Sequence, residues 1–199
     1  MRVWISLAIL SFATFAVSGQ VRYPAIRTEL LVMEKVDQDG RMKCTNSPAD
    51  EQIKCLADIS KAVDEPNTKR LAELFDQIGF PDSPKVGKDG MRAYMILLQH
   101  VTDDDLRVKS EKPITESFRK KELTPMDYAN FIDRLRLHRE KKQLYGSGFE
   151  FKDGKMVLSP TEDMRNLDKR RTRIGLPPLT EHVKMMKETY HLEVVIPSN

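Results

Sequence analysis

The apolar residues in the first half of the chain recur with the period of a helix. In the stretch "YPAIRTELLVMEKVDQDGRMKC", the residues Ile26, Leu30, Met33 and Val36 share one helix face. Helices with similar apolar faces are expected at residues 47–63 and 66–78. Gly79 follows the second of these, where a glycine commonly ends a helix.

The most apolar segment after the N-terminal leader predicts a buried helix. In "MRAYMILLQHV" the apolar positions are Met91, Ala93, Tyr94, Met95, Ile96, Leu97, Leu98 and Val101. A helix that is apolar on nearly all sides lies in the middle of a domain, because every face needs a partner. We therefore expect a central helix at about residues 88–102, with the other helices packed around it.

The second half of the chain mixes helical and strand patterns. Residues 103–123 are polar and predict two short helices, broken before Pro113 because proline interrupts a helix. Thr124 is a suitable N-cap for the helix that follows. In "FEFKDGKMVLS" apolar and polar residues alternate on either side of Asp153-Gly154, which predicts a β-hairpin near residues 149–158.

The helical pattern resumes after this hairpin. A basic helix, a Pro-Pro bend and a final helix complete the pattern. We therefore predict a mainly α fold, a compact multi-helix single domain around the central helix, with one small β-hairpin. The domain is expected to span residues 20–190, followed by a flexible tail at residues 191–199.

The N-terminus resembles a secretory signal peptide. Arg2 precedes an unbroken apolar run from Val3 to about Val17, and small residues follow. We predict a signal peptide at residues 1–19, cleaved between Gly19 and Gln20. The alternative is an uncleaved anchor, but the apolar run is shorter than the roughly 20 residues that span a bilayer. The expected location is secreted or extracellular, with no membrane attachment after cleavage.

Charge and cysteine content narrow the class of protein. The net charge is +3 with 32% charged residues, so the basic excess typical of nucleic-acid binders is absent and no nucleic-acid partner is expected. The two cysteines, Cys44 and Cys55, are expected to form a disulfide in an exported protein; the alternative is two free buried thiols. Neither cysteine belongs to a CxxC pair or has a nearby histidine, so no metal or other cofactor is predicted.

Two polar groups in the first half are candidate site residues. Gln99 and His100 end the central helix, where buried polar side chains need partners. His100 is a candidate general base, or a residue that holds two segments together. Asp37, Gln38 and Arg41 lie close together on a helix, and the spacing of Asp37 and Arg41 also fits an ordinary surface ion pair.

Four more candidates surround the helix that precedes the hairpin. Asp133 and Arg134 lie off its apolar face, where solvated charges are the usual interpretation. Gln143 and Tyr145 follow at a corner, and a buried tyrosine usually hydrogen-bonds its hydroxyl. His138 is interpreted as a bystander on a solvated face. The basic run "DKRRTR" is also better explained by a solvated face than by an anion-binding patch.

Several motifs in a fixed order resemble a widespread, mainly bacterial family of uncharacterised domains of unknown function. They are "DQDGR" (37–41), "VG" (86–87), "QHV" (99–101), "DRL" (133–135), "QLYGSGF" (143–149), "DGK" (153–155) and "KRRTRIGLPPL" (169–179). The resemblance covers about residues 29–183. Family members usually have Tyr-Gly-Thr-Gln at the corner, whereas this chain has Ser147 and Gly148 in the last two places.

The resemblance implies that the candidate residues meet in one polar pocket. We favour a secreted, non-catalytic domain, in which the polar cluster is either a pocket for a small-molecule or protein ligand or a buried network that fixes the fold. The expected binding residues are Asp37, Gln38, Arg41, Gln99, Arg134 and Gln143. The alternative is a hydrolase-like enzyme. Its candidate catalytic residues are His100, Asp133 and Tyr145, with Asp37 as another residue to orient His100 and with Arg41 or Arg134 holding an anionic group.

Overall fold

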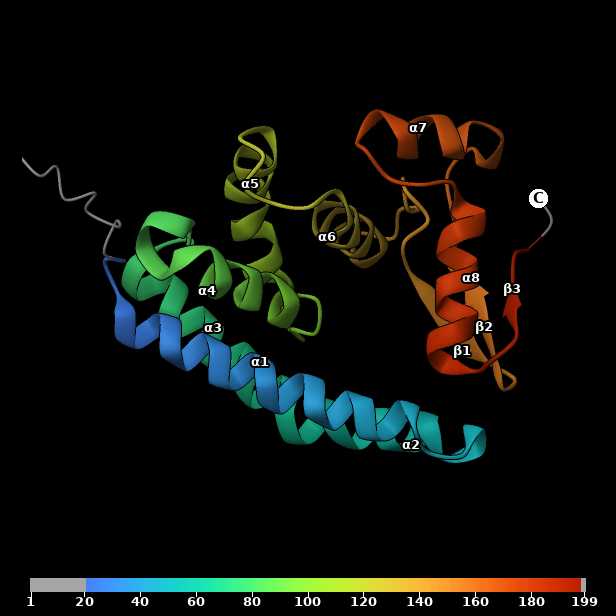
Figure 1. Cartoon of the computed structure of the whole chain (residues 1–199), viewed down its shortest axis with the longest axis horizontal. Helices are drawn as coiled ribbons and strands as arrows, with labels where there is room; N and C mark the ends of the chain where they lie inside the picture. The colour runs from blue at the N-terminus through green and yellow to red at the C-terminus, as the bar shows by residue number, and fades with distance from the viewer. Residues whose placement is uncertain (1–20, 198–199) are drawn as a thin grey trace, which may run out of the picture.

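The computed structural model describes residues 21–197 and shows a mainly α fold (Figure 1). The helices are α1 (Pro24–Thr45), α2 (Ala49–Ile59), α3 (Glu65–Ile78), α4 (Ser83–Leu98), α5 (Asp104–Arg119), α6 (Pro125–His138), α7 (Leu167–Arg173) and α8 (Leu179–Tyr190). A π-helix, η1 (Ser60–Asp64), joins α2 to α3, and a 3-10 helix, η2 (Met164–Asn166), precedes α7. The predicted fold class is confirmed. The predicted signal peptide at residues 1–19 lies outside the described residues.

The predicted central helix is confirmed as α4. Its buried residues include Met91, Tyr94, Met95 and Leu98, and α1, α3 and α6 pack against it. A short first turn, capped by Asp82 through the backbone N–H of Lys85, precedes the predicted start; Gly87 (φ 78°) is non-helical and separates this turn from the long helix that follows. Figure 1 shows α6 between the helical part of the molecule (α1–α5) and a smaller part made of the sheet, α7 and α8.

The buried face of α1 differs from the expected one. Ile26 and Leu30 are buried, but Val36 is 54% exposed. The buried face continues instead through Asp37 and Cys44, both fully buried. A stripe of apolar residues thus gives way to an acidic residue in the middle of the helix. This change of polarity marks the place where α1 meets the candidate site.

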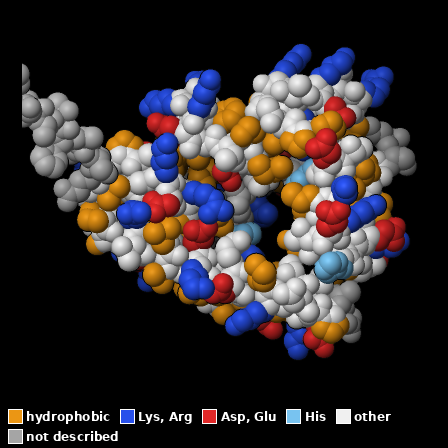
Figure 2. Space-filling model, in the orientation of Figure 1, with side chains coloured by type: hydrophobic (Ala, Val, Ile, Leu, Met, Phe, Trp, Pro, Cys, Tyr) orange, Lys and Arg blue, Asp and Glu red, His pale blue; other side chains and the backbone are white. Residues whose placement is uncertain are grey.

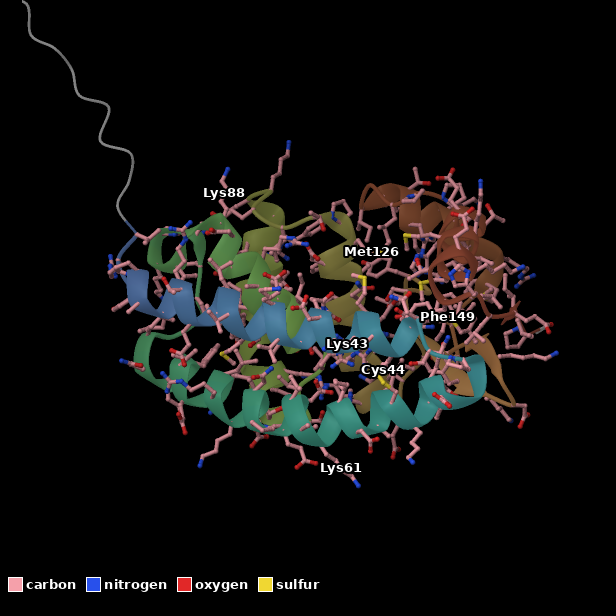
Figure 3. All side chains as sticks on the ribbon, turned by 60° about the horizontal axis from the view of Figure 1, so that its bottom comes forward. Lys43, Cys44, Lys61, Lys88, Met126 and Phe149 are labelled. Carbon is pink, nitrogen blue, oxygen red and sulfur yellow. A yellow bond between two sulfur atoms is a disulfide. The ribbon has the colours of Figure 1, made fainter. Side chains whose placement is uncertain are left out.

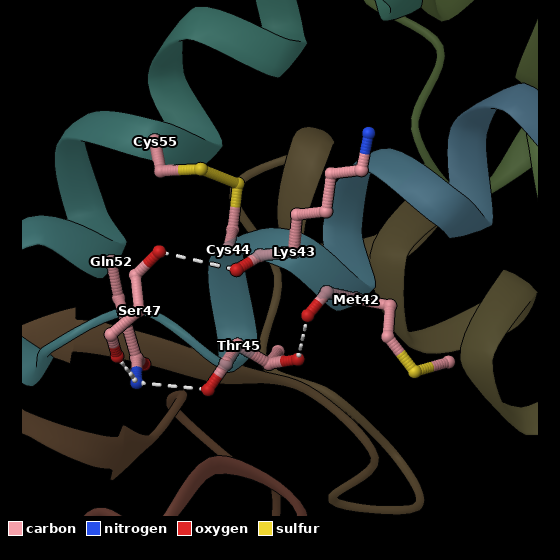
Figure 4. The surroundings of a disulfide bond; sticks show 7 residues. All are labelled: Met42, Lys43, Cys44, Thr45, Ser47, Gln52 and Cys55. Atoms are coloured by element: carbon pink, nitrogen blue, oxygen red, sulfur yellow. Dashed lines mark hydrogen bonds between the residues drawn. A yellow bond between two sulfur atoms is a disulfide. The ribbon is translucent and has the colours of Figure 1, made fainter.

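Cys44 and Cys55 form a disulfide, as predicted, between the last turn of α1 and α2 (Figures 3 and 4). The turn between the two helices is further held by Gln52, whose amide donates to the carbonyl oxygens of Thr45 and Ser47. Together these contacts fix the end of α1 against α2. Among residues 21–197, no helix combines the length and the apolar character needed to cross a membrane.

The predicted break before Pro113 is wrong, because α5 continues through it. Proline removes one backbone hydrogen bond from a helix interior, at a cost of about 3 kcal/mol. The helix persists because one face is buried at Leu106, Ser110, Ile114 and Ser117, packed against the rest of the domain. Tertiary packing here outweighs the local preference of the sequence.

The predicted hairpin is confirmed and gains a third strand. Strands β1 (Phe149–Lys152) and β2 (Lys155–Leu158) pair antiparallel around Asp153-Gly154, both with positive φ. Strand β3 (Val194–Val195) pairs in parallel with β2. Part of the flexible tail expected at residues 191–199 is therefore a strand. Its strand is held because Val194 is buried and the backbone N–H of Met156 donates to the carbonyl of Glu193.

Candidate functional site

Asp133 organises the corner between α6 and the sheet. Its carboxylate accepts hydrogen bonds from the backbone N–H groups of Leu144 (2.7 Å), Tyr145 (3.0 Å) and Ser147 (2.9 Å), and from the Ser147 hydroxyl (2.8 Å). The side chain is buried, and burial raises its pKa against the lowering effect of these bonds. All of this bonding serves to hold the loop that leaves α6.

Gln143 is a second fixed point of this corner. Its amide nitrogen donates to the carbonyl oxygens of Gly148 and Ser159 and to the hydroxyl of Thr161, at 2.9–3.2 Å. Its amide oxygen accepts from the backbone N–H of Gly148 at 2.8 Å. A Cβ at Gly148 would lie 3.1 Å from that oxygen. Gly148, where the resemblance leads one to expect a glutamine, thus leaves room for Gln143.

The basic helix α7 also belongs to the corner, so the interpretation of "DKRRTR" as a solvated face holds only in part. Arg171 is fully buried and donates to the carbonyl oxygens of Tyr145 (2.6 Å) and Pro177 (2.7 Å). Arg170 donates to the carbonyl of Leu144 at 2.8 Å. On α8, buried His182 lies 3.1 Å from the carbonyl oxygen of Ser147. The corner is therefore a network in which backbone groups find side-chain partners.

A second polar cluster forms on α1 and η1. The Arg41 guanidinium donates to the carboxylates of Asp37 (Nε to Oδ1, 3.0 Å) and Asp64 (Nη2 to Oδ1, 2.5 Å). Gln38 donates to the other oxygen of Asp37 at 2.7 Å. Asp37 is fully buried and Asp64 nearly so. The predicted Asp37–Arg41 pair is thus present, but inside the protein rather than on its surface.

The π-helix supplies Asp64 to this cluster. A π turn inserted in a helical run is uncommon and often occurs at functional sites. Burial raises the pKa of Asp64, while Arg41 lowers it and Asp37 raises it further. The carbonyl of Asp64 accepts from the hydroxyl of Thr68, which in turn accepts from the backbone N–H of Thr102 at 2.9 Å. This chain of bonds ties the π-helix to the loop that carries His100.

Arg134 and His100 complete the cluster. Burial lowers the pKa of Arg134, and Arg107 and Arg41 lower it further, whereas the carboxylate of Asp64 raises it. Burial likewise holds the pKa of His100 well below 6.5, assisted by Arg41, Arg134 and Arg107. The Arg134 side chain is nevertheless exposed and that of His100 is half-buried. Groups that are surrounded by protein yet open to water line a concave surface.

The space-filling view shows such a concavity. Figure 2 shows a hollow between the helical part of the molecule and the part that carries the sheet and α8, with basic and histidine side chains visible inside it. We call the surface around Arg41, His100, Arg107 and Arg134 the cationic cleft. Arg107 is 2% exposed, donates to Asp104 at 2.7 Å and to the carbonyl of Val101, and leaves its Nε without a partner among residues 21–197.

The structure divides the predicted residues between two clusters. Asp37, Gln38, Arg41, His100 and Arg134 belong to the cationic cleft, and Asp133, Gln143 and Tyr145 belong to the corner. The Gln99 amide donates back to the carbonyl of Met95 on its own helix at 3.4 Å.

Sequence reasoning missed Asp64 and Arg107 in the cleft. A usable signal existed for Arg107, because it shares a helix face with the buried residues Ser110, Ile114 and Ser117. Asp64 lies one turn before buried Thr68 and two before Leu71. A charged residue in phase with a buried stripe marks a candidate site.

Other parts of the described chain offer less. No group of three or more His, Cys, Asp or Glu side chains within residues 21–197 is placed to hold a metal ion. A pocket of about 380 Å³ lies beside α7, lined by Asp163, Asn166, Lys169, Arg170 and Arg173. Arg170 already donates to three carbonyl oxygens there, which leaves mainly the exposed side chains of Lys169 and Arg173 for a ligand.

Comparison with known proteins places the chain in a family. Neither the search of curated proteins nor that of solved structures found a match. The sequence model of a family of unknown function (DUF6624) matches residues 24–195, nearly all of the described chain. This protein therefore belongs to the DUF6624 family of unknown function.

Proposed function

We propose that the protein is a secreted domain that binds a small anionic ligand, a phosphate, sulfate or carboxylate group, in the cationic cleft. The observation that carries this proposal is the state of Arg134. Within residues 21–197, its guanidinium has no hydrogen-bond or ion-pair partner, and burial together with two nearby arginines lowers its pKa. A cation held near like charges raises the free energy of the ligand-free protein, and a bound anion offsets that repulsion.

The neighbouring groups suit the same ligand. The carboxylates of Asp37 and Asp64 are both engaged by Arg41, and Asp64 offsets only part of the effect of the neighbouring arginines on Arg134. Arg107 is 2% exposed and its unpartnered Nε is buried, so Arg107 adds positive charge behind the cluster rather than a donor to the ligand. A guanidinium presents its N–H donors as a planar fork that matches the oxygens of a carboxylate or phosphate. Guanidinium groups and an imidazole at one concave surface therefore favour an oxyanion over a neutral ligand.

A hydrolase based on His100 is supported less well. A general base of this kind needs a carboxylate to orient its ring. Asp133 uses both carboxylate oxygens in the corner, and Asp37 is held by Arg41 and Gln38. Within residues 21–197, the His100 ring has no hydrogen-bond partner. His100 is thus better suited to contact a ligand than to activate one.

Sulfate is a suitable probe, because it carries two charges at every pH near neutrality. We expect sodium sulfate to raise the melting temperature of the mature protein above that in sodium chloride of equal ionic strength. A ligand at ten times its Kd stabilises by about 1.4 kcal/mol. The Arg134→Gln variant should lose this response. An equal sulfate response in Arg134→Gln and in the wild type would refute the proposal.

Arg173→Gln is the matched control. Arg173 is exposed on α7 and lines the basic pocket beside that helix. The control should respond to sulfate like the wild type. Loss of the response in Arg173→Gln alone would place the anion beside α7 and overturn the assignment to the cleft.

Export is supported by the N-terminal pattern and by the Cys44–Cys55 disulfide, since disulfides persist in oxidising compartments. Expression of the full chain in a secreting host, followed by N-terminal sequencing, tests this part. We expect a mature protein that begins at Gln20. A product that keeps Met1 and stays with the membrane fraction would favour the uncleaved anchor.

A further inference from the structure

Strand β1 leaves one side of the sheet open. The strand order is β1-β2-β3, so β1 has a neighbouring strand on one side only. Gly148, directly before β1, accepts a hydrogen bond from the backbone N–H of Ser159, which follows β2. Backbone groups of successive residues in an antiparallel strand point to opposite sides, so those of Phe149 and Phe151 point away from β2. Within residues 21–197 they have no hydrogen-bond partner, which leaves two donors and two acceptors along the open edge.

This open edge borders the hollow of the molecule. Figure 1 shows β1 as the strand nearest the helical part, and Figure 2 shows the hollow between that part and the sheet. Strand β3, at the other edge, lies on the far side of the sheet and has only two residues. An extended chain in the hollow can therefore pair with β1, because the backbone of any peptide carries the matching donors and acceptors.

The beginning of β1 lies against the part of α6 that carries Arg134. The backbone N–H and the hydroxyl of Ser147 donate to Asp133 at 2.9 Å and 2.8 Å. A Cβ at Gly148 would lie 3.9 Å from Cδ1 of Leu137, one turn further along α6. Arg134 lies between these two contacts in the sequence of α6, and its exposed guanidinium has no partner within residues 21–197. Figure 1 shows the hairpin running away from α6, so only the start of β1 is near this cation.

We propose that β1 binds the C-terminal segment of an extended peptide as an additional antiparallel strand, and that Arg134 binds the terminal carboxylate of that peptide. This inference rests on the proposed function, because it names the anion that the cationic cleft takes. A strand antiparallel to β1 runs toward α6, so its C-terminus arrives at the cleft. A parallel strand would bring a positively charged N-terminus to the same place, where the arginines repel it. The charge of the cleft therefore selects the direction of the bound chain.

A probe peptide follows from the residues of β1. Glu150 and Lys152 are exposed, so a lysine opposite Glu150 and a glutamate opposite Lys152 add favourable cross-strand pairs. Valine, which favours strands, stands opposite Phe151 and Phe149. Two further residues extend the chain by about 7 Å toward α6. The probe is therefore Glu-Val-Lys-Val-Ser-Ala with fluorescein on its N-terminus, prepared in one form with a free C-terminal carboxylate and in another with a C-terminal amide.

Fluorescence anisotropy with the mature protein tests the carboxylate. We expect the free acid to bind the wild type roughly tenfold or more tighter than the amide, the size typical of a hydrogen bond to a charged group. Arg134→Gln should bind both forms equally, at the affinity of the amide. Arg173→Gln, which removes an exposed cation from α7, is the control and should keep the preference. Equal affinities of the two forms for the wild type would overturn the inference.

Methylated forms of the same peptide test the strand pairing without changing the protein. In an antiparallel pair, the residues opposite Phe149 and Phe151 exchange both backbone hydrogen bonds with them. Methyl groups on the backbone nitrogens of the two valines should therefore weaken binding by roughly tenfold or more. Methyl groups on the backbone nitrogens of the lysine and the serine, which point away from β1, are the matched control and should have much less effect. Equal affinities of the two methylated peptides would overturn strand addition.

The variant Phe151→Pro assigns the pairing to β1. Proline removes the outward N–H of this residue and leaves the ladder to β2 in place, as proline does on edge strands. Phe151 also packs edge-on against the ring of Tyr190, so Tyr190→Leu is the matched control that loses this contact and keeps the edge. We expect weaker probe binding in Phe151→Pro and wild-type binding in Tyr190→Leu. Wild-type binding by Phe151→Pro that circular dichroism shows to be folded would overturn the assignment to β1; if it does not fold, the methylated peptides decide.

The remaining outcomes separate this inference from the proposed function. A sulfate response that depends on Arg134, without binding of the probe, would overturn the inference and leave the proposed function standing. Loss of both the sulfate response and the preference for the free acid would overturn both. A dimer detected by sedimentation in the wild type and absent in Phe151→Pro would assign the open edge to a second copy of the chain and would also overturn the inference.

Discussion

Replacing Arg134 by glutamine should stabilise the ligand-free protein while it removes anion binding. A basic group whose pKa is lower in the folded than in the unfolded chain binds its proton less tightly when folded. Its charge therefore opposes folding at every pH below the folded-state pKa. Arg134 is such a group, and arginine remains protonated at neutral pH. Because the guanidinium has no partner within residues 21–197, its removal leaves no donor or acceptor unpaired.

The magnitude follows from the charges around it. Two like charges repel by roughly 4 kcal/mol at about 4 Å and an effective dielectric constant of about 20, and by proportionally less when they lie further apart. Arg107 and Arg41 both repel Arg134, and Asp64 attracts it, so about one such repulsion remains. Water reaches the exposed side chain and screens the charge, which reduces the expected gain to about 1 kcal/mol. For a chain of this size, that corresponds to a rise of about 2–4 °C in Tm.

Differential scanning calorimetry in buffer without sulfate or phosphate measures this gain. Arg173→Gln again serves as the control, since it removes the same charge from an exposed position on α7. The difference between the two variants should shrink as sodium chloride is added, because salt screens the repulsion. A Tm for Arg134→Gln below that of Arg173→Gln would show that Arg134 stabilises the fold, and the reasoning about an unpaired cation would fail.

Three further predictions concern the corner and the disulfide. Burial lowers the pKa of His182 from 6.5, so the unfolded chain takes up a proton more readily than the folded chain. The free energy of unfolding should therefore fall as pH drops below about 6.5. Urea denaturation should show a smaller fall in His182→Gln than in the wild type. Asp133→Ala should lose about 3–5 kcal/mol in the same assay, because buried backbone N–H groups lose their acceptor, and Asp133→Asn should lose less. The double variant Cys44→Ser, Cys55→Ser should lose about 2–3 kcal/mol in guanidinium denaturation, and a reductant should then have no further effect.

Features that depend on local pattern were predictable from the sequence. The central helix was found because its apolar residues surround the axis, and the hairpin because Asp153-Gly154 adopts the positive φ values that its turn needs. Features that depend on distant partners were not. Helix α5 continues through Pro113 because its buried face packs on the domain, and β3 exists only because β2 offers it an edge.

The candidate site shows the same limit. Every polar residue of the corner that we singled out is buried or half-buried, but its partners are mostly backbone groups that no side-chain pattern reveals. In the cleft, Arg41 was correctly paired with Asp37 by spacing, whereas its second partner, Asp64, comes from a π turn. Helical spacing alone assumes regular α-helix, so it misplaces residues around such a turn.

The neighbours Asp133 and Arg134 connect the two clusters. Successive residues of a helix point about 100° apart, so Asp133 can face the corner while Arg134 faces the cleft. The bonds of Asp133 to the backbone of Leu144, Tyr145 and Ser147 fix the rotation of α6 about its axis. That rotation sets the direction of Arg134 and, one turn later, of His138. A substitution in the corner should therefore weaken anion binding without touching the ligand. Residues of the corner and residues of the cationic cleft can then serve the same binding function, although their side chains do not touch the same ligand.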